Sequence, residues 1–331
     1  MTPTLVYLAT DRHIRHVTDP VDRAGLERWI IEFVAENPRF TVDQAVVVAR
    51  QLAERWGFDV VADERRREEL VQPVLYTEAE WLARGRVPDP GARPVRMLGS
   101  RRERFGCFLS GDVSPAPGAE ESTRWPVVDA LERSRHLRRR AHHLAPEYRE
   151  FAEVLTDYEL ALLRHVWVIG AVVEWDDDPD YDTVGWIRNG PRDRRRLPRP
   201  DLTGDEALFR LLINPWPGEE NVMVVILGLL AQILALTVLG RWRGAPVTGE
   251  DGEDGVTHPG ELETGLIAHL VARRLGLDES VRDRGVRGYL HGEVPGPAPE
   301  GVRWNLVFET AEVLEDVLRG NSVFTWRAAG D

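Results

Sequence analysis

Lysine is missing from this sequence altogether. Lysine and arginine together number 42, and every one of these residues is arginine, although lysine is ordinarily among the commoner residues. A Walker A phosphate loop, a protein-kinase ATP site, a pyridoxal Schiff base and a Ser-x-x-Lys nucleophile all require a lysine side chain. Enzyme classes that depend on these sites are therefore excluded. Codon bias in a GC-rich genome and selection against amine-directed modification are the two explanations for the absence.

Cysteine is nearly absent as well. Cys107 is the single cysteine, so neither an intramolecular disulfide nor a cysteine-rich zinc site can form. Nothing near Cys107 in the sequence identifies a base that would activate its thiol, and we expect an inert, partly packed side chain. The segment Met1–His16 has no apolar run of the kind found in secretory signals, so we expect a cytoplasmic location.

Positive charge is in deficit, because the formal net charge is −13. This balance argues against a general binder of nucleic acid or anionic membranes, both of which require a positive surface. The arginines are nevertheless concentrated in two segments, which we consider as candidate nucleic-acid contacts: Arg133, Arg135, Arg138, Arg139 and Arg140, and then Arg192, Arg194, Arg195 and Arg196. These side chains either bind phosphates of duplex DNA or pair with acidic segments of the same chain.

Only one long apolar run is present. It spans residues 222–239, VMVVILGLLAQILALTVL, and is interrupted only by Gln232 and Thr237. A membrane span needs about 20 apolar residues, whereas a helix that is apolar all round can instead be buried by neighbouring helices. The flanking charges would require the long preceding part of the chain to cross the membrane without a signal sequence. We therefore expect a buried core helix and no membrane association.

The hydrophobic periodicity predicts a mainly α fold, a multi-helix soluble protein around the buried apolar helix, with small β-hairpins. Helix starts are predicted where Thr is followed three residues later by Glu or Gln, at Thr41, Thr77, Thr156 and Thr203. A last amphipathic helix runs from Trp304 to Leu318 and ends at Gly320. The start of the chain, Leu5–Leu8, is expected to be extended.

Composition divides the chain into three parts. Residues 1–83 form an N-terminal helical unit, and residues 84–125 form a linker or loop rich in Pro, Gly and Arg. Residues 126–331 form a helical core domain. This domain contains a predicted β-hairpin at 172–187 and a flexible acidic loop at 244–260.

Three segments resemble DNA-binding units. The two helices before Gly57 are joined by a tight turn, as in a helix-turn-helix or in any helical hairpin. A helix followed by the hairpin at 172–187 resembles a winged helix. Residues 266–295 resemble a repressor-type helix-turn-helix, although Gly285 and Gly288 weaken the second helix.

Two groups of acidic and histidine side chains were considered as metal sites. Asp176, Asp177 and Asp180 have the Asp-Asp-x-x-Asp spacing with which terpene synthases, which this turn resembles, hold magnesium. Here the motif contains a proline and lies between strand-like runs rather than on a helix, so a solvated turn is expected across Asp176–Asp182. The second group does not have the spacing of a zinc motif: His258, Glu261, Glu263 and His269. We predict no catalytic residue, cofactor or metal.

Three functional hypotheses remain. The first is a non-enzymatic regulatory protein that binds duplex DNA through winged-helix or helix-turn-helix units and the two arginine segments. The second is an adaptor or regulatory module that binds an unidentified protein partner without nucleic acid. The third is an enzyme that works through carboxylates or histidines, or through a metal at Asp176–Asp182.

Overall fold

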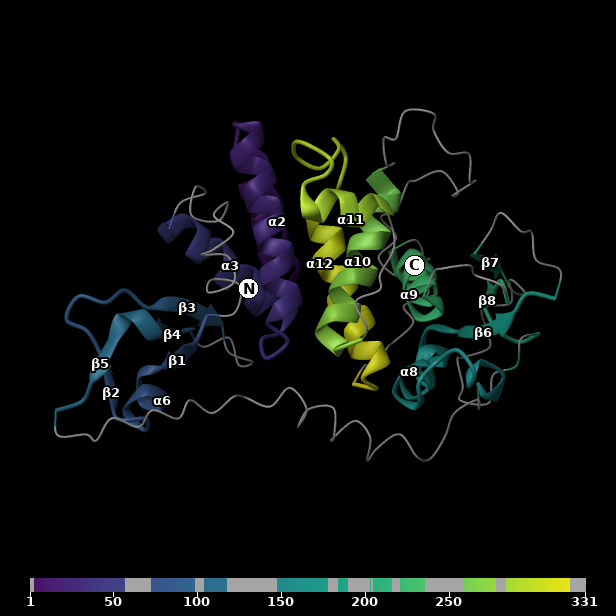
Figure 1. Cartoon of the computed structure of the whole chain (residues 1–331), viewed down its shortest axis with the longest axis horizontal. Helices are drawn as coiled ribbons and strands as arrows, with labels where there is room; N and C mark the ends of the chain where they lie inside the picture. The colour runs from purple at the N-terminus through teal and green to yellow at the C-terminus, as the bar shows by residue number, and fades with distance from the viewer. Residues whose placement is uncertain are drawn as a thin grey trace, which may run out of the picture. The chain divides into compact units, whose positions relative to one another are not determined.

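The computed structural model describes residues 3–56, 73–98, 104–117, 148–177, 184–189, 203, 205–215, 221–235, 259–277 and 284–321 (Figure 1). The chain divides into two compact units, Met1–Ala130 and Leu131–Asp331, which are described separately. Helices dominate the described residues and the strands form small sheets. The predicted mainly α class is thus confirmed.

Three helices open the first unit: α1 (Pro3–His16), α2 (Pro20–Glu36) and α3 (Val42–Trp56). The Asp19 carboxylate caps α2 and Pro20 occupies its first turn, as is common at helix N-termini. The buried Trp29 indole donates a hydrogen bond to the Ala49 carbonyl (2.9 Å), which ties α2 to α3. The predicted extended start at Leu5–Leu8 is wrong, because buried residues recur at helical spacing along α1: Val6, Tyr7, Thr10 and Ile14.

The first unit continues with β1 (Leu75–Thr77) and with α6 (Glu78–Leu82), the short helix predicted to begin at Thr77. Where the sequence predicts a linker or loop, the structure has β2 (Arg86–Pro88), β3 (Val95–Leu98), β4 (Arg104–Leu109), the 3-10 turn η1 (Ser110–Asp112) and β5 (Val113–Pro115). β4 lies between β1 and β3 in an antiparallel sheet, and β2 pairs with β5. These strands span only three to six residues, so their pairing is set by tertiary context rather than by local propensity.

In the second unit, the predicted hairpin at 172–187 is wrong. Its two runs do form strands, β6 (Ala171–Trp175) and β7 (Gly185–Asn189), but they are not paired with each other. A third strand, β8 (Phe209–Ile213), lies between them, parallel to β6 and antiparallel to β7. A helix is predicted to begin at Thr203, yet the Thr203 carbonyl only closes a turn by accepting the Ala207 N–H (2.9 Å), and the chain then enters β8.

Helices and 3-10 turns complete the second unit: η2 (Arg149–Phe151), α8 (Asp157–Leu163), η3 (Val166–Ile169), α9 (Val222–Ile233), α10 (Pro259–Leu275), α11 (Arg284–His291) and α12 (Trp304–Leu318). α9, from the long apolar run, packs against α10 and against β7 and β8. α10 also packs against α12. Among the residues that the structure describes, no helix is both long enough and apolar enough to cross a bilayer.

Two buried ion pairs join α10 to the α12 segment. Arg274 donates to Glu315 (2.6 Å), and both side chains are almost completely buried. Glu263, with 2% of its side chain exposed, accepts hydrogen bonds from the backbone N–H and the guanidinium of Arg303, the N-cap residue of α12. Opposite charges inside the helical layer therefore compensate one another, as burial requires.

Candidate interaction surface

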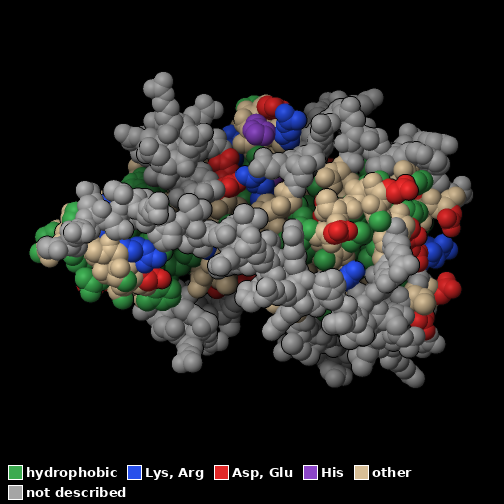
Figure 2. All heavy atoms as spheres, turned by 60° about the horizontal axis from the view of Figure 1, so that its bottom comes forward, with side chains coloured by type: hydrophobic (Ala, Val, Ile, Leu, Met, Phe, Trp, Pro, Cys, Tyr) green, Lys and Arg blue, Asp and Glu red, His purple; other side chains and the backbone are tan. Residues whose placement is uncertain are grey.

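The nine arginines predicted to contact nucleic acid lie outside the described residues, as do residues 244–258 of the predicted acidic loop. Arginines that the structure does describe are engaged by carboxylates in several places. Arg55 pairs with Asp112 (2.8 Å) and Arg210 with Glu174 (2.6 Å). Figure 2 shows basic and acidic side chains interspersed on the face that it displays. Within the described part of the chain, Arg55 and Arg210 are therefore paired with carboxylates of the same chain.

The β6–β8–β7 sheet has two different faces, which follow from its register. One face is mainly apolar and includes Ile187, Leu211 and Ile213. This face meets α9, because a Cβ at Gly185 would lie only 2.9 Å from the Val225 side chain. The opposite face, the outer face, is formed by Val172, Glu174, Trp186, Arg188, Arg210 and Leu212.

The outer face carries an exposed aromatic side chain among charges. Trp186 is 40% exposed on β7, and Arg188 follows it on the same face and is also exposed. Arg188 lies directly opposite Arg210 across the β7–β8 ladder, but Arg210 is neutralised by Glu174. The described part of the chain gives Arg188 no ion pair. Trp and Arg are the side-chain types that most often dominate binding energy at protein interfaces.

Asp176, from the predicted acidic turn, positions the exposed indole. The Trp186 Nε1–H donates to the Asp176 carboxylate (2.7 Å), while the Asp176 backbone N–H donates to the Ile213 carbonyl (2.8 Å). Because Asp176 directly follows β6 and Trp186 belongs to β7, the indole reaches across β8. The described part of the turn is therefore a structural link between strands.

Carboxylates and aromatic rings also gather beside β6. Burial raises the pKa of Glu150, and the nearby charges of Glu174 and Asp177 raise it further. Trp175 stacks on Phe151 with 4.1 Å between ring centroids, and its Nε1–H donates to the Glu150 carbonyl (3.1 Å). Tyr148 is buried, and this burial raises the pKa of its phenol. This edge of the sheet is negatively charged and well packed.

The acidic and histidine groups that were compared with metal sites are described only in part. Within the described ranges, no group of three or more His, Cys, Asp or Glu side chains is placed to hold a metal ion. Glu263 instead binds Arg303. His258 and residues 178–183 of the acidic turn lie outside the described residues. Asp176 and Glu263, one from each group, thus bind Trp186 and Arg303 within the fold.

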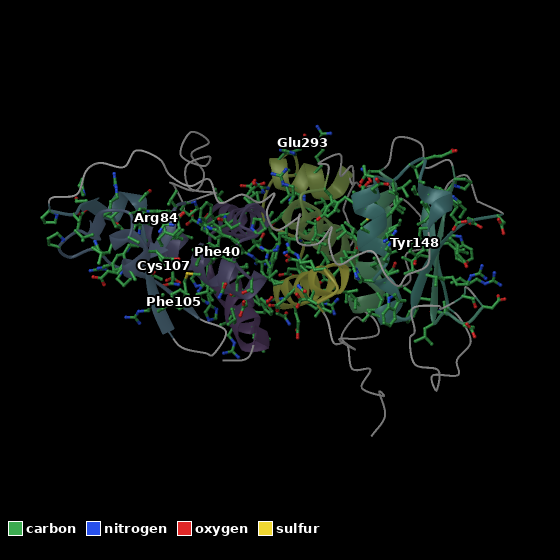
Figure 3. All side chains as sticks on the ribbon, turned by 90° about the horizontal axis from the view of Figure 1, so that it is seen from below. Phe40, Arg84, Phe105, Cys107, Tyr148 and Glu293 are labelled. Atoms are coloured by element: carbon green, nitrogen blue, oxygen red, sulfur yellow. The ribbon has the colours of Figure 1, made fainter. Side chains whose placement is uncertain are left out.

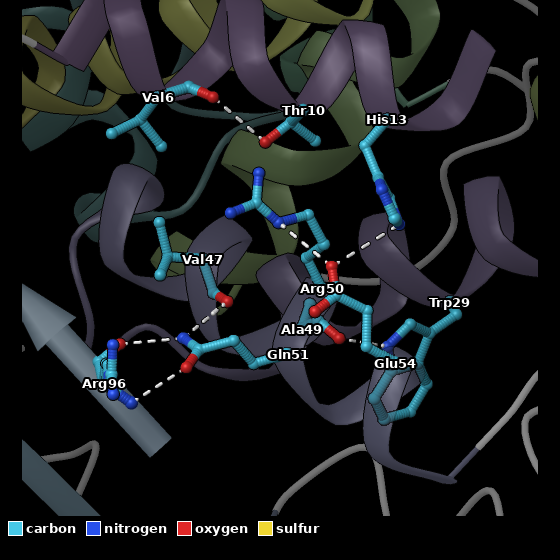
Figure 4. A network of polar contacts seen from close by, with 10 residues as sticks. All are labelled: Val6, Thr10, His13, Trp29, Val47, Ala49, Arg50, Gln51, Glu54 and Arg96. Atoms are coloured by element: carbon cyan, nitrogen blue, oxygen red, sulfur yellow. Dashed lines mark hydrogen bonds and ion pairs between the residues drawn. The ribbon is translucent and has the colours of Figure 1, made fainter. Parts of the chain in front are cut away.

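A polar network in the first unit has a structural role (Figure 4). Glu54 lies 3.8 Å from His13 Nε2 and 3.7 Å from Arg50 Nε, and burial lowers the pKa of His13. The Gln51 amide donates to the Arg96 carbonyl (2.8 Å) and accepts the Arg96 backbone N–H (2.9 Å). Gln51 thereby protects the outer edge of β3, since exposed strand edges invite unwanted pairing.

Cys107, labelled in Figure 3, lies in the middle of β4 and is 4% exposed. Burial and the charge of Glu80 raise the pKa of its thiol to about 11, although the Arg39 guanidinium opposes this effect. A thiol with this pKa is protonated at neutral pH and is a poor nucleophile. The expectation of an inert cysteine is supported by this geometry.

The segment that resembles a repressor-type helix-turn-helix contains α10 and α11. α10 is largely buried between α9 and α12, and α11 buries Val286, Tyr289 and Leu290. His269 of α10 is strongly desolvated, and this burial together with the charge of His291 lowers its pKa to about 4. On the described residues of α11, the Arg287 and His291 side chains are exposed. Packing within the helical layer accounts for the apolar pattern of this segment.

Comparison of the chain with known protein families, curated proteins and solved structures gave no match. The candidate surface therefore stands on its geometry. The sequence predicts a strand at 184–187 but does not reveal that Trp186 and Arg188 lie exposed on one face of the sheet. Their alternation in GWIRN indicates that both lie on one face, whereas their exposed position depends on the insertion of β8 beside β7.

Proposed function

We propose that this chain is a non-enzymatic regulatory protein that acts by binding a polypeptide at β7, through the outer edge of the strand and the adjoining outer face of the sheet. The observation that carries the proposal is that Trp186 and Arg188 are exposed on β7, which is an edge strand of its sheet. Extended polypeptides bind such strands by adding to the sheet, and side chains on alternate positions supply specificity. The pairing of described arginines with carboxylates favours this adaptor hypothesis over DNA binding.

A peptide-display selection tests this function. Random linear peptides would be selected for binding to full-length protein immobilised at low density. The affinity of each selected peptide would then be measured for wild type and for the Ile187→Pro variant. The substitution removes one backbone donor from β7, and the expected result is peptides that bind wild type and lose at least about tenfold in affinity for the variant. Equal affinity for both proteins, or no enrichment of any peptide, would contradict the proposal.

Duplex DNA is the second candidate partner, and the arginine density of residues 133–140 and 192–196 favours it. Fluorescence anisotropy with labelled duplex DNA over a salt series tests it. If these arginines bind phosphates, affinity will fall steeply with salt, and Arg138→Ala with Arg195→Ala will reduce that slope. No binding at low salt would exclude this candidate.

A further inference from the structure

The backbone groups of β7 divide into an inner and an outer set. The Asn214 N–H donates to the Val184 carbonyl (2.9 Å), and residues 184 and 214 are partners in the β7–β8 register. Hydrogen-bonded pairs alternate with non-hydrogen-bonded pairs along an antiparallel ladder, so the backbone groups of Trp186 and Arg188 also face β8. Those of Gly185, Ile187 and Asn189 point away from β8.

The other side of β8 supports this assignment. The Ile213 carbonyl accepts the Asp176 N–H (2.8 Å), and the Phe209 N–H donates to the Gly170 carbonyl (3.1 Å). Odd-numbered residues of β8 therefore bond toward β6, and even-numbered ones toward β7. Among the described residues no strand pairs with the outer edge of β7. Three N–H and three C=O groups of β7 are thus directed outward.

From this arrangement we infer that β7 pairs antiparallel with β7 of a second copy of the chain, about a two-fold axis at Ile187. The inference rests on the proposed function and names the partner. Each outward residue then meets another outward residue: Gly185 meets Asn189, and Ile187 meets Ile187 of the second copy. Hydrogen-bonded pairs in an antiparallel ladder join residues that direct their backbone groups toward each other. The edge is self-complementary, as a two-fold interface requires.

The same register matches the side chains on the outer face. Trp186 lies opposite Arg188 of the second copy, and Arg188 lies opposite Trp186 of the second copy. These are non-hydrogen-bonded pairs, in which side chains approach most closely. An arginine over an indole ring makes a favourable cation–π contact, and the pairing forms twice.

Neighbouring registers are less favourable. Moving the axis to Arg188 places the two Arg188 side chains opposite each other, and like charges in that position are destabilising. Moving the axis to Trp186 leaves fewer outward residues of β7 paired. Only the register centred on Ile187 overlaps all five residues of the strand, Gly185–Asn189, and pairs each Trp186 with an arginine. The five-residue sequence therefore selects one pairing.

Sedimentation equilibrium of the full-length protein over a range of concentrations tests the inference. Wild type is expected to form a concentration-dependent dimer. Ile187→Pro removes an outward N–H and leaves the bonds to β8, so it should abolish the dimer while circular dichroism shows the same fold. Arg188→Glu should weaken the dimer about tenfold. Val294→Ser, which changes an exposed apolar residue (46% exposed) of the second unit away from β7 in the sequence, is the control and should leave the dimer unchanged.

Two outcomes would overturn the inference: a wild-type protein that is monomeric at every concentration, or a dimer that persists in both β7 variants. These results are distinguishable from failure of the proposed function. If wild type is monomeric but binds selected peptides that the Ile187→Pro variant does not bind, the proposed function stands. The second copy is then refuted as the partner. If the dimer depends on β7 but no peptide binds, the inferred dimer stands. Binding of other polypeptides at β7 is then refuted.

Discussion

Replacing Arg303 by alanine should destabilise the second unit by removing the partner of a buried charge. Glu263 is 2% exposed in its side chain and accepts three hydrogen bonds from Arg303: from the backbone N–H (2.7 Å), from Nε (3.0 Å) and from NH2 (2.7 Å). Arg303→Ala keeps the first bond and removes the other two together with the positive charge. Breaking a buried pair by removing one partner costs about 3–5 kcal/mol. Because Arg303 itself is 29% exposed and water can enter its place, we expect about 3 kcal/mol.

Urea unfolding followed by circular dichroism measures this cost. Two further proteins sharpen the test. Glu263→Gln combined with Arg303→Ala removes the buried carboxylate that Arg303→Ala leaves without its ion pair. The double variant should recover part of the lost free energy of unfolding, because a neutral amide is less costly to bury. Arg287→Ala changes an exposed arginine of α11 and should stay within about 0.5 kcal/mol of wild type. A cost for Arg303→Ala no larger than that of Arg287→Ala would refute the reasoning.

Three other perturbations test the packing of the chain. The Cys107 thiol, 4% exposed with a pKa of about 11, should react with a thiol reagent at neutral pH only after unfolding; rapid labelling of the native protein would contradict its burial. The lowered pKa of His269, about 4 against 6.5, means that the unfolded chain binds a proton first as pH falls. Stability should therefore drop by up to about 3 kcal/mol between pH 6.5 and pH 4, and His269→Gln should flatten that slope in pH-dependent urea titrations. Gly170→Ala should lower the melting temperature, because φ is +73° and the new Cβ would lie 2.8 Å from Leu208; an unchanged melting temperature would show that the turn relaxes freely.

Helix positions were predictable where local chemistry decides them. The capping boxes at Thr77 and Thr156 begin α6 and α8, and in each the Thr side chain and the third residue's carboxylate bond reciprocally to the backbone. The apolar run forms α9, and the last amphipathic pattern forms α12 with Gly320 in the left-handed conformation after it. These signals lie within a few residues of the structure that they determine.

Strand partners were not predictable from the same local signals. The Thr203 hydroxyl does bond to the Glu206 carboxylate (3.1 Å), yet the segment that follows becomes β8 because it is buried between β6 and β7. Without β8, the two strand-like runs around the acidic turn have the pattern of a hairpin. The outer edge of β7 follows from that long-range insertion, so the candidate surface could not be located from sequence spacing alone.

The central claim, that the outer edge of β7 is a binding edge, is tested most directly by residue-resolved amide hydrogen exchange on β7 at low and high protein concentration. The account predicts slow exchange at Trp186 and Arg188 throughout, because their N–H groups bond to β8. At Ile187 it predicts fast exchange in dilute solution and slower exchange in concentrated solution. An Ile187 amide that exchanges at one rate at all concentrations, whether fast or slow, would contradict pairing of this edge with a second copy.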